Sequence, residues 1–238
     1  MTVRGADLIG RIGSCYQDVI SRGLVASEGR SFEIVGVTKT LPVSTVLAGY
    51  HAGLRNFGEN YATELISKAS DPSLVFREDP LIWHFIGSIQ SRTIRKLADH
   101  VSVWHSVCRE KEVEGIAEFS PKASVFVQVN FSQGQHRNGV SLGEASELVN
   151  LCIEKGLQVL GLMVVPPIVD REKLKDIFVA VNLERLRLGL PGCSMGMSDD
   201  FELALSSGST HIRLGRILFG DRGETGLLGP NLGQGGPG

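Results

Sequence analysis

The stretch Ser124-Val-Phe-Val-Gln-Val-Asn130 is a short, nearly continuous apolar run rich in β-branched side chains, with no glycine or proline inside it. A run of this kind is typical of a strand in a parallel sheet that is buried on both faces. Similar runs alternate with helical patterns from residue 32 almost to the end of the chain. We predict eight strands in all: Phe32–Thr38, Arg55–Gly58, Ile82–Gly87, Ser102–Val107, Ser124–Asn130, Val159–Val165, Cys193–Met195 and His211–Gly215.

Between these runs, local signals mark the beginnings and ends of helices. Pro42 fits the first turn of one helix and Gly53 stands just past its end, which is the usual asymmetry of these two residues. Ser141 with Glu144 forms the sequence pattern of a capping box for a second helix. Ser198 is in a position to cap a third helix that follows the seventh strand. The predicted strands are therefore joined by helical crossovers.

Eight strand–helix steps in about 190 residues predict a single-domain α/β fold, a (β/α)8 barrel of the TIM type. An additional amphipathic helix over residues 5–23 precedes the first strand. A doubly wound open sheet stays the alternative, because a count of strands does not show whether the sheet closes. We expect the barrel to occupy residues 1–222 and the Gly/Pro-rich residues 223–238 to form a disordered tail.

Composition excludes several classes of function. The 238 residues carry a formal net charge of -2, which offers no basic surface for nucleic acid. The longest apolar stretches fall far below the ~18 residues of a membrane span, and the first residues lack the apolar core of a signal peptide. The cysteines are far apart and the histidines lack ligand spacing. We therefore expect a cytoplasmic protein with reduced cysteines and no metal site.

In a barrel, side chains at the C-terminal strand ends face one mouth, where barrel enzymes keep their sites. The groups expected there are Lys39, Asn60, His84, His105, Asn130, Met163, Ser194 and Arg213. The loops after strands seven and eight commonly bind phosphate. Here they contain the Ser194 hydroxyl and the backbone N–H groups around Gly215 and Arg216, which suit an anion. Two ordinary tight turns are the other interpretation of the same loops.

Lys39 follows the first apolar strand and precedes a helix, so its side chain should point into the mouth. A partly desolvated lysine amine can form a Schiff base with a carbonyl compound. A plain surface lysine is the alternative at this position. A cofactor-free lysine aldolase whose substrate carries the phosphate is an alternative function.

The segment Gly192-Cys-Ser-Met-Gly196 also matches the G-x-S-x-G nucleophile turn of α/β-hydrolases. In that fold the acid and then the histidine follow the serine along the chain. Only 44 residues follow Ser194, and their one histidine, His211, lies in a predicted strand. The hydrolase interpretation is therefore rejected.

Several motifs in order resemble the YggS/PROSC family of pyridoxal phosphate homeostasis proteins, which is related to the N-terminal barrel of alanine racemase. The resemblance extends over roughly residues 5–222. The motifs are Val35-Gly-Val-Thr-Lys39-Thr, Asn56-Phe-Gly-Glu-Asn60-Tyr, Trp83-His-Phe-Ile-Gly87, Gly161-Leu-Met-Val-Val-Pro-Pro167, Ser194-Met-Gly-Met-Ser-Asp-Asp200 and Gly208-Ser-Thr-His-Ile-Arg-Leu-Gly215.

The resemblance assigns a role to each candidate residue. It implies that Lys39 forms an internal aldimine with pyridoxal 5'-phosphate and that Arg213 faces the pyridine nitrogen. It further implies phosphate contacts from Ser194, Gly215 and Arg216, and a pocket lining that includes Asn60, Met163 and His84. Arg216 stands where the family often has threonine, so the role of its side chain is open.

The resemblance implies a cofactor-binding protein and not an enzyme. A cation beside the pyridine nitrogen disfavours its protonation and makes the ring a weaker electron sink. Racemases of this fold compensate with a tyrosine from an added C-terminal domain, whereas this chain has no tyrosine after Tyr61. We expect a monomer that buffers or delivers the cofactor to apo-enzymes and so influences amino-acid and keto-acid balance. The alternative is an amino-acid racemase or decarboxylase with His84, His105 or Tyr61 as acid or base.

Overall fold

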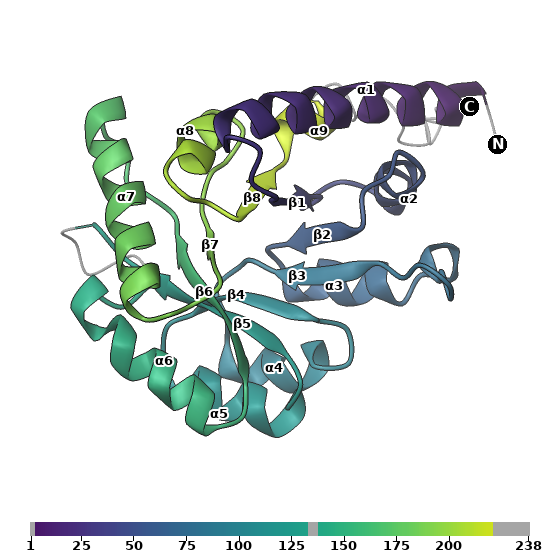
Figure 1. Cartoon of the computed structure of the whole chain (residues 1–238). Helices are drawn as coiled ribbons and strands as arrows, with labels where there is room; N and C mark the ends of the chain where they lie inside the picture. Colours follow the sequence, from purple (N-terminus) through teal and green to yellow (C-terminus); the bar gives the residue numbers. More distant parts are fainter. Residues whose placement is uncertain (1–2, 133–137, 221–238) are drawn as a thin grey trace, which may run out of the picture.

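The computed structural model describes residues 3–132 and 138–220, and within them the eight predicted strands form a closed parallel barrel in the order β1 to β8 (Figure 1). Each strand pairs in parallel with its neighbours along the chain, with register shifts in the β4–β5 and β5–β6 pairs, and β1 closes the sheet against β8, with Val35 opposite Arg213. The barrel prediction is confirmed and the open sheet is wrong. The strands are β1 (Glu33–Val37), β2 (Asn56–Glu59), β3 (Ile82–Phe85), β4 (Val103–Val107), β5 (Ser124–Val129), β6 (Gln158–Val164), β7 (Gly192–Ser194) and β8 (His211–Leu214).

Helices cover the outside of the barrel, and an α-helix follows each of the eight strands (Figure 1). The additional N-terminal helix α1 (Val3–Ala26) is confirmed and packs against α2, α8 and α9. The others are α2 (Val43–His51), α3 (Ala62–Ala69), α4 (Ser91–Leu97), α5 (Glu110–Phe119), α6 (Ala145–Glu154), α7 (Arg171–Arg187), α8 (Phe201–Ser206) and α9 (Arg216–Phe219), with short 3-10 turns η1 (Pro72–Leu74) and η2 (Leu142–Glu144).

Two of the predicted helix signals act nearly as expected. Pro42 is the N-cap of α2, one position before the helical turn in which we placed it, and Gly53 follows the helix with a φ of 106°. Ser141 and Glu144 form the predicted capping box, which begins η2 and leads into α6. These ends are set by local hydrogen bonds, which explains why sequence alone located them.

The predicted cap at Ser198 is wrong. Helix α8 begins only at Phe201, because the Asp200 carboxylate accepts a hydrogen bond from the Met197 N–H at 2.5 Å and closes a turn ahead of the helix. The Ser198 hydroxyl instead accepts the Ile217 N–H at 3.4 Å, across to the loop after β8. Ser198 therefore joins the two loops in which we predicted a phosphate site.

The core has two parts. A large apolar layer fills the space between barrel and helices and includes the fully buried Trp104, Phe57 and Phe178. Inside the barrel the apolar cluster is small and consists of Val103, Phe126 and Met163, with Leu160 against it. The rest of the barrel interior holds buried polar groups, which sets this barrel apart from the usual layers of branched apolar side chains.

No helix in residues 3–132 and 138–220 has the length and hydropathy needed to cross a membrane. The tail predicted over residues 223–238 lies outside the described residues.

Candidate functional site

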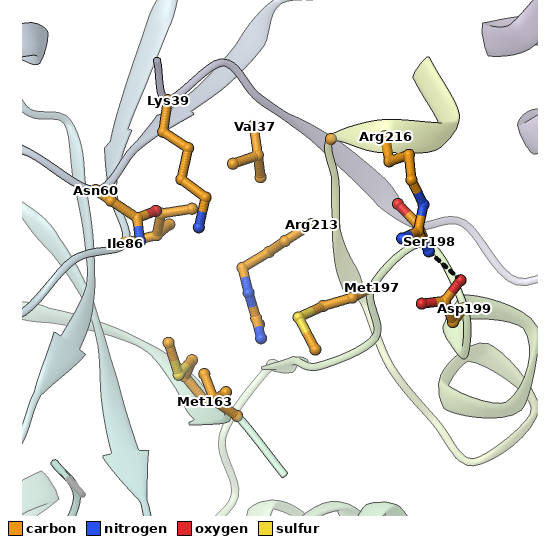
Figure 2. A pocket seen from close by; sticks show the side chains of 12 residues that line it. Val37, Lys39, Asn60, Ile86, Met163, Met197, Ser198, Asp199, Arg213 and Arg216 are labelled. Atoms are coloured by element: carbon orange, nitrogen blue, oxygen red, sulfur yellow. Dashed lines mark hydrogen bonds and ion pairs between the residues drawn. The ribbon is translucent and has the colours of Figure 1, made fainter. Parts of the chain in front are cut away.

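A cavity of about 390 Å³ opens at the C-terminal ends of the strands, a size usual for small-molecule sites (Figure 2). It lies where the ends of β1, β2, β6 and β8 meet the loops after β7 and β8. Its lining consists of Val37, Lys39, Asn60, Ile86, Met163, Val165, Met197, Ser198, Asp199, Arg213, Gly215 and Arg216.

Six predicted site residues meet in this lining, and two do not. Lys39, Asn60, Met163, Arg213, Gly215 and Arg216 border the cavity, whereas His84 and Ser194 lie deeper in the barrel. Ser198 borders the cavity and is absent from our predicted site. Its position in the loop after the seventh strand was a usable signal, but we interpreted the serine as a helix cap.

The Lys39 side chain points into the cavity, toward the same space as the Arg213 guanidinium (Figure 2). Lys39 lies two residues after the end of β1, in the turn that leads to α2. The next residue, Thr40, has a φ of 63°, a left-handed conformation that a β-branched residue rarely adopts. The turn that presents Lys39 is therefore strained.

Arg213 is a cation buried at the floor of the cavity, with 5% of its surface exposed. Its Nη1 donates to the backbone oxygen and to the hydroxyl of Ser194, both at 2.7 Å, and its Nη2 donates to the Val164 oxygen at 2.9 Å. Burial lowers the pKa of Arg213 to about 10, although Asp200 opposes this shift. The guanidinium therefore stays charged at neutral pH and is held in one orientation.

A chain of hydrogen bonds runs from Arg213 through the barrel interior. Ser194 Oγ, which accepts from Arg213, lies 2.8 Å from His105 Nδ1. His105 Nε2 lies 2.8 Å from His84 Nδ1, and His84 Nε2 lies 2.9 Å from Asn56 Oδ1. Asn56 is the first residue of β2, so the chain reaches the opposite end of the barrel.

His84 and His105, the two histidines in this row of hydrogen bonds, are neutral. Every bond in the row is donated in the same direction, from Arg213 toward Asn56. Burial lowers the pKa of His84 to about 3 and holds the pKa of His105 well below its usual range. The Asn56 amide oxygen can only accept, so His84 donates from Nε2 and accepts at Nδ1. His105 then donates from Nε2, and the Ser194 hydroxyl donates to His105 Nδ1.

This arrangement corrects the expected positions of His84, His105 and Ser194. We placed all three at the mouth because they stand near strand ends, but His84 is 2% exposed and His105 and Ser194 are 0% exposed. The Ser194 hydroxyl donates to His105 and accepts from Arg213, so its proton points away from the cavity. Within the described residues, the hydroxyl that borders the cavity near α9 belongs to Ser198.

The side chain of Arg216 points toward Asp199 and forms an ion pair with it (Figure 2). Both groups are largely exposed, so the pair adds little to stability. It does orient the Arg216 guanidinium toward the rim of the cavity. The backbone of Gly215 and Arg216, together with Ser198, forms the adjacent wall.

Asn60 offers an unused hydrogen-bonding group in the lining. Its Oδ1 is buried and has no hydrogen-bond partner among the described residues. The backbone of Asn60 is packed against Gly87, where an added Cβ would lie 1.9 Å from the Asn60 oxygen. A buried polar atom without a partner is costly, and a ligand can supply that partner. The cavity thus combines an amine, a buried guanidinium, an unsatisfied amide and a hydroxyl-bearing loop.

Comparison with known proteins identifies the family. Residues 28–223 match the family of the alanine racemase N-terminal domain. The chain is 37% identical over 197 residues to a pyridoxal phosphate homeostasis protein of Pseudomonas aeruginosa, covering 79% of this chain and 84% of the relative. The Schizosaccharomyces pombe protein of that name is 32% identical, covering 89% and 93%.

A solved structure agrees with the curated relatives. PipY of Synechococcus elongatus PCC7942, solved with pyridoxal phosphate bound, is 28% identical to this chain with a TM-score of 0.76, covering 88% of this chain and all of PipY. The barrel, its strand order and the sequence relationship agree. The chain belongs to the family of pyridoxal phosphate homeostasis proteins.

Proposed function

We propose that this protein binds pyridoxal phosphate covalently through Lys39 and holds it for intracellular supply, without efficient catalysis of its own. The observation that carries the proposal is the meeting of the Lys39 amine and the Arg213 guanidinium in one cavity of about 390 Å³. The relatives named for homeostasis of this cofactor, and PipY with the cofactor bound, support the choice of ligand.

The groups around the cavity fit this cofactor. Lys39 would hold the cofactor through its amine, which can attach to an aldehyde carbon while the aldehyde oxygen leaves as water with two amine protons. Ser198 and the backbone of Gly215 and Arg216 form a wall suited to the phosphate, and the unsatisfied Asn60 amide can bond a polar ring substituent. Met163 supplies an apolar contact from the floor. Ser194 would act indirectly, because its hydroxyl orients Arg213.

Arg213 supports a role in holding the cofactor. When bound, pyridoxal phosphate acts as an electron sink whose strength depends on protonation of its ring nitrogen. A fixed guanidinium beside that nitrogen disfavours this protonation. Since Arg213 is held by Ser194 and Val164 and stays charged, it would keep the ring in its less reactive form.

An amino-acid racemase or decarboxylase is less favoured by the geometry. Either reaction needs an acid or base beside the bound substrate. The candidates were His84, His105 and Tyr61, and none of them borders the cavity in the described part of the chain. Both histidines are buried and neutral, and Tyr61 is about half exposed at the start of α3.

One experiment tests the covalent binding. The protein is mixed with pyridoxal phosphate, treated with borohydride and digested, and the modified peptide is identified by mass spectrometry. We expect the label on Lys39 and a visible absorbance that the Lys39→Ala variant lacks, with Lys111→Ala on the exposed face of α5 as the matched control. A protein that stays colourless and unlabelled with excess cofactor would refute the proposal.

Two further measurements separate carrier from enzyme. Incubating the loaded protein with single enantiomers of amino acids tests for turnover, and sustained multiple turnovers would contradict the carrier role. Mixing it with a purified apo-enzyme that requires pyridoxal phosphate tests delivery, which we expect to restore activity. The expected monomer and cytoplasmic location stay predictions, to be checked by light scattering and cell fractionation.

A further inference from the structure

The two residues that flank Lys39 are both bonded to one ionic cluster, which is buried at Glu59 and Lys68 and partly exposed at Glu64. This cluster, here called the Lys68 cluster, consists of Glu59 at the end of β2 and of Glu64 and Lys68 on α3. Lys68 Nζ lies 2.7 Å from Glu59 Oε1 and 3.5 Å from Glu64 Oε2. Glu64 and Lys68 are four residues apart, so they lie on one face of the helix.

On the N-terminal side of Lys39, the cluster holds Thr38. Lys68 Nζ donates to the Thr38 backbone oxygen at 2.7 Å, and the Thr38 hydroxyl donates to Glu59 Oε1 at 2.6 Å. Thr38 and Glu59 are fully buried, and the Lys68 side chain is 7% exposed. These bonds fix the last residue before Lys39 from two directions.

On the C-terminal side, the cluster holds Thr40. The Thr40 N–H donates to Glu64 Oε2 at 2.7 Å. Thr40 is one of two non-glycine residues with positive φ among residues 3–132 and 138–220. A β-branched residue keeps such a conformation only when its surroundings impose it, and strain of this kind gathers at functional sites. Here the Glu64 carboxylate accepts from the Thr40 N–H, and the Leu41 N–H closes the turn by donating to the Thr38 oxygen at 3.0 Å.

Burial of the Glu59 carboxylate in this cluster costs free energy, so the stability of the fold does not by itself explain the cluster. Glu59 is buried and its Oε2 has no hydrogen-bond partner among the described residues. Burial raises the pKa of Glu59, while the bonds from Lys68 and Thr38 act in the opposite direction. Well-packed apolar side chains would often be as stable as a buried ion pair. Its contacts with Thr38 and Thr40 give this cluster a more specific role.

We propose that Glu59, Glu64 and Lys68 are positioning residues that hold the Thr38–Thr40 turn in its strained form and so direct the Lys39 amine into the cavity. The inference rests on the proposed function in one respect, the use of Lys39 as the attachment site. It extends the set of residues that act on the site to three that do not border the cavity. Loss of any bond between cluster and turn should let the turn relax and the amine move away.

The first test needs no cofactor. In the cofactor-free protein, amide hydrogen exchange at Thr40 and the scalar coupling that reports its φ are measured by NMR. We expect Glu64→Ala to release the left-handed conformation and to speed exchange at Thr40 by at least about tenfold. Glu118→Ala, on the exposed face of α5, is the matched control and should change neither value.

The second test measures affinity for pyridoxal phosphate by absorbance titration. We expect Glu64→Ala to weaken binding about tenfold, which corresponds to 1.4 kcal/mol. Adding Thr40→Gly to this variant should restore affinity to within about threefold of the wild type, since glycine adopts positive φ without strain. A loss of overall stability would not be repaired by this second change, so rescue separates positioning from a general structural role.

Lys68 needs a variant that still folds. Lys68→Met alone leaves the buried Glu59 carboxylate without its cation, so Glu59→Gln is combined with it. The double variant should still bind about tenfold more weakly, because the Thr38 oxygen keeps only the Leu41 N–H at 3.0 Å and has lost the bond from Lys68. Lys111→Met is its control.

The outcomes keep the two proposals apart. If the wild type fails to bind the cofactor, the proposed function fails, while Thr40 exchange still tests the cluster. If the wild type binds and both Glu64→Ala and the Lys68 double variant keep affinity within about twofold, the positioning role is overturned. An unchanged Thr40 conformation in Glu64→Ala would overturn it as well.

Discussion

Acid should destabilise this protein through the histidines of the barrel interior, and the size of the effect can be worked out. Burial lowers the pKa of His84 to about 3 and that of His211 to about 4, from 6.5 in an unfolded chain. Below pH 6.5 the unfolded state therefore binds more protons than the folded state. The stability that the neutral forms provide is complete above about pH 6.5 and is lost as pH falls toward 4 and 3.

Each histidine contributes a loss of about 2 kcal/mol in the free energy of unfolding between pH 7.5 and pH 5. His105 acts in the same direction, because its pKa is also lowered by burial. Glu59 and Asp200 act in the opposite direction, since burial raises the pKa of both carboxyl groups. The change in the free energy of unfolding with pH, measured on the wild type alone, therefore does not give the contribution of any one residue.

A comparison of the wild type with a variant that lacks His84 does give the contribution of this residue. Urea unfolding of the wild type and of His84→Gln is followed at several pH values by the fluorescence of the buried Trp83 and Trp104. The variant loses hydrogen bonds to Asn56 and His105 and should be less stable at pH 7.5. Its further loss down to pH 5 should be smaller than that of the wild type by about 2 kcal/mol.

The control is His51→Gln, which removes an imidazole from the exposed end of α2. The pH dependence of the free energy of unfolding in His51→Gln should differ from that in His84→Gln. An equal pH slope in the wild type and in His84→Gln would refute the reasoning, because it would mean that His84 is not held neutral by burial.

Nitrogen NMR of the cofactor-free protein should show His84 and His105 protonated at Nε2 only, and a proton on Nδ1 of either would reverse the derived chain. Ser198→Ala should weaken pyridoxal phosphate binding about tenfold in an absorbance titration and lower the melting temperature only slightly, since the lost bond from the Ile217 N–H is long at 3.4 Å; unchanged affinity would remove Ser198 from the phosphate wall. Gly87→Ala should cost about 1–3 kcal/mol in urea unfolding, because its Cβ meets the Asn60 backbone, and a neutral effect would contradict that contact.

The alternation of strands and helices could be predicted, as could the ends of α2 and the capping box ahead of α6, because these features depend on neighbours along the chain. The strand Ser124–Val129 and the capping box at Ser141 form because of residues within the same short segment. The position of Lys39 just after β1 follows in the same way. The family resemblance added the identity of a cofactor, which local patterns do not specify.

The depth of each side chain inside the barrel could not be predicted. His84 and Ser194 stand near strand ends in sequence, yet strand tilt and stagger place them beneath the cavity, where they meet His105 and Arg213. Ser198 carried a capping signal, but Asp200 closes the turn and leaves the serine beside Ile217. For His84 and Ser194 partners distant in sequence decided the outcome, whereas for Ser198 a competing local bond from Met197 to Asp200 did so.

The sequence by itself determined which elements form, their order, and the end of the barrel at which Lys39 and Arg213 would meet. These follow from local hydrogen bonding and from the rule that parallel strands end together. Only the tertiary structure decided that Lys68 reaches Thr38, that Glu64 holds Thr40, and that a neutral histidine chain supports Arg213. Such contacts depend on the register between strands and on helix packing, which no local pattern encodes.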